Sequence, residues 1–132
     1  MIFIDTNYFL RLLLNDVPEQ TKTVRDFIEG ASKNKSKLFT SVLVLFEVNW
    51  VLTSQYQQTK VQVIEAIDNI LEIKIISLAK RHVLEKALKI YKEKKLSLED
   101  CYHLAYAIEQ DAKEFKTFDK KLEKEFKKLA SS

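Results

Sequence analysis

The side chains of this sequence that are best placed for chemistry are acidic. Asp5 ends a short apolar run that predicts a buried strand, and a helical pattern follows it at once. Glu47 interrupts the apolar segment 42–52, where burying an unpaired carboxylate would cost several kcal/mol or more. Asp100 falls in the first turn of a predicted helix, and Asp119 lies just beyond the last predicted strand. These acids are spread over most of the chain, so only the fold can bring them together.

The elements that must position these acids alternate between short strands and helices. This alternation favours an α/β fold, with a parallel sheet covered by helices on both faces. Sites in such sheets form at the carboxyl ends of the strands, and each of the four acids lies at or near that edge. The sequence therefore predicts that the acids converge. The predicted strands cover residues 2–5, 38–41, 74–78 and 114–117, and the predicted helices cover 8–14, 19–32, 42–55, 59–71, 81–94, 97–108 and 119–129.

Local signals set the ends of the predicted helices. Ser41, Thr59 and Ser97 are expected N-caps, because each hydroxyl precedes an apolar helical pattern. Pro18 suits the first turn of a helix. Gly30 and the polar residues after it are expected to end that helix.

The four carboxylates together indicate a metal site. Like charges a few ångströms apart repel and raise one or more pKa values, and a hard divalent cation removes that conflict. An all-oxygen set without His or Cys points to Mg²⁺ or Mn²⁺ rather than to zinc. Such an ion activates water and stabilises charge on a phosphodiester, so the residues predict a metal-dependent nuclease. Each acid alone could equally be a helix cap or a first-turn residue, worth about 0.3–1 kcal/mol against the helix dipole.

The bulk properties predict one globular domain over residues 1–132. Hydrophobic residues make up 46% and charged residues 31% of the chain, which excludes a disordered class. No apolar run reaches the roughly 18 residues of a membrane span, and the first residues lack the basic start of a signal peptide. The single cysteine, Cys101, allows no internal disulfide, so we expect a cytoplasmic protein. With one glycine, the chain has no phosphate-binding glycine motif.

Four motifs in this order and spacing resemble a PIN domain, specifically the toxin type called VapC. The resemblance covers essentially the whole chain. It implies a three-layer α/β/α fold with a short parallel central sheet and strand order 3-2-1-4-5. It also implies a homodimer and a cognate antitoxin whose C-terminal segment lies across the site. The matching motifs are Ile4–Asn7, Phe46–Val48, Leu98–Ala105 and Thr117–Leu122.

The same resemblance implies roles for individual residues. The four acids would bind Mg²⁺ or Mn²⁺ and support cleavage of single-stranded RNA, with Asp5 and Asp100 as the core ligands. Asn7 and Thr117 match the polar residues that orient the acids in the family. The expected function is thus a metal-dependent endoribonuclease that acts as the toxin of a toxin–antitoxin pair. The alternatives are a housekeeping RNA-processing nuclease of the same fold and a non-catalytic RNA- or protein-binding module.

Other side chains near the acids have weaker signals. Cys101 lies on an apolar stripe and is expected in the core, and His103 is expected at a surface or interface. Basic residues that flank the acids are candidates for phosphate contacts, against the common alternative of a solvated charged surface. These candidates are Arg11, Lys116, Lys120 and Lys121.

Overall fold

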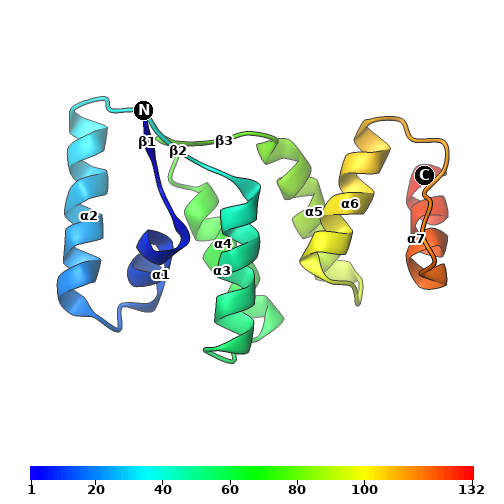
Figure 1. Cartoon of the computed structure of the whole chain (residues 1–132), viewed down its shortest axis with the longest axis horizontal. Helices are drawn as coiled ribbons and strands as arrows, with labels where there is room; N and C mark the ends of the chain where they lie inside the picture. The colour runs from blue at the N-terminus through cyan, green and yellow to red at the C-terminus, as the bar shows by residue number, and fades with distance from the viewer. The chain divides into compact units, whose positions relative to one another are not determined.

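The computed structural model describes all 132 residues, which form two compact units, Met1–Ala79 and Lys80–Ser132 (Figure 1). The first unit contains β1 (Ile2–Phe3), α1 (Thr6–Leu14), α2 (Pro18–Lys33), β2 (Leu38–Thr40), α3 (Val42–Ser54), α4 (Lys60–Leu71) and β3 (Ile76–Leu78). The second unit contains α5 (Arg81–Glu93), α6 (Leu98–Glu109) and α7 (Lys120–Ala130). The chain is rich in helices and has one small parallel sheet, so the α/β fold class is as predicted.

The sheet of the first unit has the order β1-β2-β3, and both strand pairs are parallel. This is the 3-2-1 part of the expected strand order. Ile2 pairs with Leu38, and the ladder continues past β1 where the Ile4 N–H donates to the Phe39 carbonyl at 2.9 Å. β1 pairs on one side only, and Phe3 is 47% exposed while Ile4 is buried. The prediction of a buried first strand is therefore wrong for its first residues.

The helices after α1 begin within one residue of their predicted starts, whereas α1 begins at Thr6, two residues before its predicted start, because Asp5 caps it. Ser41, Thr59 and Ser97 each cap a helix by accepting a hydrogen bond from a backbone N–H, and Thr59 forms a reciprocal capping box with Gln62. Pro18 lies in the first turn of α2, where its missing N–H has no cost. Side-chain chemistry at these positions therefore decides where the helices start.

The predicted strand over residues 114–117 is wrong. These residues form no strand, and the second unit contains helices only, so it offers no strand for them to pair with. Phe115 instead packs into the core of this unit, with its ring centroid 5.3 Å from that of Phe126. The fourth and fifth strands of the expected order are absent from the sheet, which has three strands.

Each unit has its own packing. In the first unit α1 packs against α2 and α3, and α3 packs against α4. In the second unit α6 packs against both α5 and α7. None of the helices combines the length and the apolar character that a membrane crossing requires. The side chains that are fully buried in the first unit include Leu38, Leu45, Val48, Leu52, Val63 and Ile67, and those in the second include Val83, Leu84, Leu98 and Leu104.

α2 ends at Lys33, one residue beyond the predicted end at 32, so Gly30 lies in its last turn. The Asn34 N–H bonds to the Gly30 carbonyl at 2.9 Å. A glycine in a helix interior is unfavourable by about 1 kcal/mol relative to alanine, an amount that the packing of a long helix overrides. A Cβ at position 30 would meet no atom within 4 Å.

We therefore predict that Gly30→Ala stabilises the protein by about 0.5–1 kcal/mol, because it reduces the freedom of the unfolded chain without a clash. Thermal and urea unfolding of the two proteins measure this change. The neighbouring Ala31→Gly is the reverse control and should destabilise, since Ala31 is buried in the same helix. A Gly30→Ala protein that is less stable than the parent would contradict the assigned path of α2.

Candidate active site

Thr6 links two of the four predicted acids in the first unit. Its backbone N–H donates to Asp5 Oδ1 at 2.8 Å, and its hydroxyl donates to Glu47 Oε2 at 3.1 Å, across 41 positions of sequence. Thr6 is 6% exposed, whereas both carboxylates are exposed. The start of α1 and the second turn of α3 thus present Asp5 and Glu47 on the two sides of one buried residue.

Glu47 is on the surface of α3, so the burial argument made from sequence does not apply to it. The helix is apolar nearly all round, but only part of that surface is covered. Leu43 and Trp50, one turn to either side of Glu47, are 68% and 61% exposed. Trp50 is therefore not a core residue, contrary to the default expectation for a tryptophan. The hydrogen bond from Thr6, and not burial, is what distinguishes Glu47.

The other two acids stand at the starts of helices in the second unit. Asp119 caps α7, with Oδ1 accepting from the Leu122 N–H at 3.1 Å. The Asp119 N–H in turn donates to the Thr117 hydroxyl at 3.0 Å, so Thr117 braces the backbone of this acid. Asp100 lies in the first turn of α6, where its N–H donates to Ser97 at 3.1 Å and its carboxylate is half-buried.

The donor chemistry of these residues fits a hard divalent cation. Neither unit on its own gathers three or more His, Cys, Asp or Glu side chains close enough to hold a metal. Asp5 and Asp119 each use Oδ1 for a helix N-terminus, and no recorded contact engages their Oδ2 atoms. Carboxylate oxygens of this kind are the ligands that Mg²⁺ and Mn²⁺ prefer. Convergence of all four acids stays a prediction.

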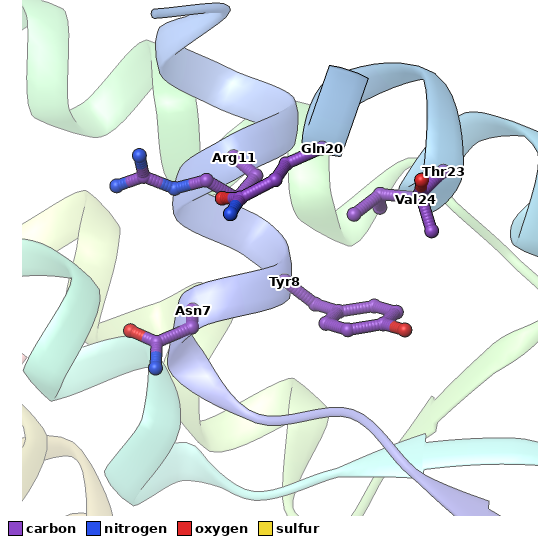
Figure 2. Close-up of a pocket in the computed structure, with 6 residues that line it drawn as sticks. All are labelled: Asn7, Tyr8, Arg11, Gln20, Thr23 and Val24. Carbon is purple, nitrogen blue, oxygen red and sulfur yellow. The ribbon is translucent and has the colours of Figure 1, made fainter. Parts of the chain in front are cut away.

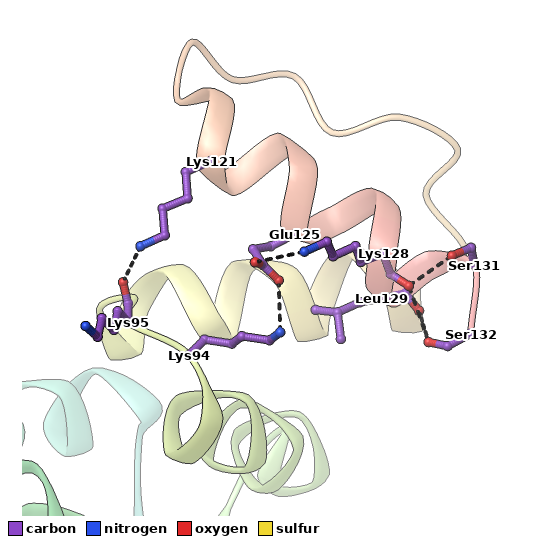
Figure 3. Close-up of polar contacts among 8 residues, drawn as sticks. All are labelled: Lys94, Lys95, Lys121, Glu125, Lys128, Leu129, Ser131 and Ser132. Carbon is purple, nitrogen blue, oxygen red and sulfur yellow. Dashed lines mark hydrogen bonds and ion pairs between the residues drawn. The ribbon is translucent and has the colours of Figure 1, made fainter.

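The basic candidates of the second unit differ in their surroundings. Lys121 donates to the Lys95 carbonyl at 3.1 Å and so ties the start of α7 to the segment before α6 (Figure 3). Lys116 forms an exposed ion pair with Glu114 at 3.3 Å. Lys120 is exposed and has no recorded partner. Of the three lysines, Lys120 has the side chain most available to a phosphate.

A pocket of about 440 Å³ lies between α1 and α2, beginning two residues beyond Asp5 (Figure 2). Arg11, one of the phosphate candidates, lines it and forms an ion pair with Asp16 at 3.0 Å. Sequence reasoning named two of the lining residues but not the pocket, because it forms only where two helices pack. Its lining residues are Asn7, Tyr8, Arg11, Gln20, Thr23 and Val24.

A tyrosine pair on α6 was also missed from sequence. The rings of Tyr102 and Tyr106, one turn apart, are nearly parallel with centroids 6.3 Å apart, and the Lys80 ammonium lies 5.5 Å from the Tyr106 centroid. Burial raises the pKa of Tyr102, with smaller contributions from Tyr106 and Glu109, so its phenol is neutral at physiological pH. The sequence signal that could have predicted this pair is the spacing of four residues between the two tyrosines, which places them one helical turn apart.

Two other residues of α6, Cys101 and His103, were also considered from sequence, and they lie on opposite faces of the helix. Cys101 is fully buried, which confirms its assignment to the core. His103 is exposed, as expected.

Comparison with known proteins decides the family. A family model described as the PIN domain matches residues 2–129, which includes both units and all four acids. The chain belongs to the PIN-domain family. The VapC ribonuclease of Aquifex aeolicus (strain VF5) is 24% identical to this PIN domain over 124 residues, which cover 94% of the chain and 91% of that relative. No solved structure matches the chain. The small parallel sheet among many helices agrees with the α/β/α fold expected of a PIN domain.

The capping role of Asp119 gives a prediction that separates structure from chemistry. Asp119→Ala should lower the free energy of unfolding by about 1 kcal/mol, because the Leu122 N–H loses its acceptor. Asp119→Asn should keep most of the stability, since asparagine is an equally good N-cap. Urea unfolding of the two variants measures the difference, and equal stability would show that the cap contributes nothing.

Proposed function

We propose that this PIN domain is a divalent-metal-dependent endoribonuclease that hydrolyses RNA phosphodiester bonds. The observation that carries the proposal is the pair of hydrogen bonds by which Thr6 holds Asp5 and Glu47. Thr6 thus links two exposed carboxylates, and a cation bound by both would offset the repulsion between their like charges. The name of the relative, a ribonuclease, supports RNA as the substrate.

In this proposal the two units form one domain, and acids from each bind Mg²⁺ or Mn²⁺. Asp5 and Asp100 are the core ligands, and Glu47 and Asp119 complete the set. When bound, the ion lowers the pKa of a water molecule and stabilises charge on the phosphodiester. Thr6 keeps its two carboxylates in place.

Polar and basic neighbours would orient the acids and the RNA. Asn7 and Thr117 are the proposed supporting residues, and Thr117 already bonds to the Asp119 backbone. A net charge of +3 favours an anionic partner. The proposed phosphate contacts are Arg11, Lys116, Lys120 and Lys121.

The biological role proposed is that of the toxin in a type II toxin–antitoxin pair. The name VapC of the relative supports this role over that of a housekeeping RNA-processing enzyme. The proposal includes a cognate antitoxin that blocks the site, a homodimeric state and a cytoplasmic location. A binding module without catalysis is disfavoured, because all four acids are present.

We predict that the purified protein cleaves RNA only with Mg²⁺ or Mn²⁺, and that Asp5→Asn or Asp100→Asn abolishes cleavage. Asparagine keeps the local hydrogen bonding of a helix start but removes the charge that binds the ion. A panel of transfer, ribosomal and messenger RNA, with Mn²⁺ or with EDTA, measures this activity. The fragments produced also distinguish a toxin, which cuts a restricted target, from a processing enzyme.

Asp26→Asn is the matched control, since Asp26 is an exposed carboxylate on α2 that pairs only with Lys22. It should cleave like the parent. Full cleavage by Asp5→Asn, or in EDTA, would reject the metal-site assignment. An absence of cleavage in protein freed of bound antitoxin would favour the binding module.

Metal binding should also appear as thermal stabilisation. A ligand that binds only the native state raises the free energy of unfolding by about 2.7 kcal/mol when its free concentration is roughly 100 times Kd. We predict that Mn²⁺ raises Tm of the parent protein and raises it less in Thr6→Val, which loses the hydroxyl that holds Glu47. Thr6→Ser keeps that hydroxyl and should restore the shift. Equal shifts in Thr6→Val and the parent would show that Thr6 does not position a metal ligand.

A further inference from the structure

The pocket between α1 and α2 is next to the proposed catalytic acids but plays no part in metal binding. Asp5 caps α1, and Asn7, Tyr8 and Arg11 bring the first two turns of the same helix into the pocket wall. A ligand in the pocket would therefore lie within one or two helical turns of a proposed metal ligand. The opposite wall comes from α2, through Gln20, Thr23 and Val24.

The walls of the pocket offer hydrogen-bonding groups that the protein leaves without partners. The side-chain amides of Asn7 and Gln20 form no hydrogen bond with any other residue. Asn and Gln amides each present a donor and an acceptor side by side, which matches the edge of a nucleic-acid base. Figure 2 shows Asn7 and Arg11 on the same side of α1, with the Gln20 side chain reaching from α2 toward Arg11.

Arg11 supplies a positioned positive charge. Its Nη1 atom donates to Asp16 Oδ1 at 3.0 Å, and Asp16 in turn accepts from the Tyr56 hydroxyl at 3.3 Å. The Arg11 side chain is only 21% exposed, so this pair fixes the direction of the guanidinium. An arginine has five N–H donors, and Asp16 engages one of its nitrogens. The remaining donors can bind a phosphate.

Tyr8 supplies an aromatic surface on the side of α1 that faces α2. Its ring meets the Phe27 ring of α2 edge to face, with centroids 5.9 Å apart and planes at 89°. This contact holds the ring in place while 39% of the residue stays exposed. Val24, which is buried, adds an apolar patch to the opposite wall. Any of the four bases can stack on such a ring, because every base has a planar aromatic face.

We propose that this α1–α2 pocket binds one unstacked nucleotide of single-stranded RNA beside the scissile phosphodiester. The base stacks on Tyr8, the Gln20 amide reads its edge, and Arg11 contacts its phosphate. The inference rests on the proposed ribonuclease function, because the RNA strand must lead from the pocket to the acids. A peptide helix is a poorer match, since such helices dock through several apolar anchors and Val24 is the one aliphatic residue in this lining.

The test measures RNA binding separately from RNA cleavage. Fluorescence anisotropy gives Kd for labelled single-stranded homopolymers of A, C, G and U, with Mn²⁺, in an Asp5→Asn background that prevents turnover. Tyr8→Leu should weaken binding about tenfold, because it removes the stacking surface but keeps an apolar contact with Phe27. Tyr8→Phe keeps the ring and should restore the affinity.

The amide contacts are tested by base preference. Gln20→Ala should reduce the differences in Kd among the four homopolymers, whereas Gln55→Ala, an exposed glutamine just after α3, should leave them unchanged. Circular dichroism and Tm of each variant check that the fold is kept.

The outcomes separate the pocket from the proposed function. Unchanged affinity and base preference in both Tyr8→Leu and Gln20→Ala overturn the nucleotide pocket, even if the parent protein cleaves RNA. Absence of any RNA binding by the parent protein also overturns it. The same holds if the two substitutions weaken binding of a protein partner and leave RNA binding unchanged. Tyr8-dependent binding in a protein that never cleaves RNA supports the pocket and rejects the nuclease.

Discussion

The hydroxyl of Thr6 is the interaction on which the arrangement of the first unit's acids depends. Thr6 is buried, and a buried hydroxyl without a partner is unfavourable by about 1–3 kcal/mol. Its donation to Glu47 therefore holds α3 against the start of α1. The end of the sheet is held in the same way, because the buried Thr40 hydroxyl donates to the Ile4 carbonyl at 2.8 Å. Two threonines thus locate the point where strand becomes helix and where Asp5 emerges.

Structural and chemical roles coexist in the acids at helix starts. Asp5 and Asp119 act as N-caps, which is the structural interpretation that sequence alone could not separate from a functional one. A cap occupies one carboxylate oxygen and leaves the other without a recorded contact. Capping is therefore compatible with the proposed role of these carboxylates as ligands of a cation.

One short helix connects the acids with the pocket. α1 places Asp5 at its N-terminus, Asn7 and Arg11 one turn apart on one side, and Tyr8 toward α2. Because a helix repeats every 3.6 residues, this spacing fixes the relative directions of these side chains. The second wall needs only the packing of α2 against α1, which its buried residues Thr21 and Val24 provide. A proposed metal ligand and the proposed nucleotide pocket thus share one helix.

The sequence by itself determined the local structure and the candidate residues. Hydroxyl caps, Pro18 and apolar periodicity located the helices, since these signals act over a few residues. The four acids and the family resemblance followed from short motifs. The stretch around Phe115 was misjudged, because a strand exists only where a partner strand is present.

Only the tertiary structure decided which distant side chains meet. The sequence left open whether Glu47 faces solvent or the interior, and the fold makes it an exposed acceptor for Thr6, 41 positions away. The pocket between α1 and α2 likewise has no signature in either helix alone. Contacts of this kind depend on how helices pack, and packing joins residues whose separation along the chain carries no information about their distance in space.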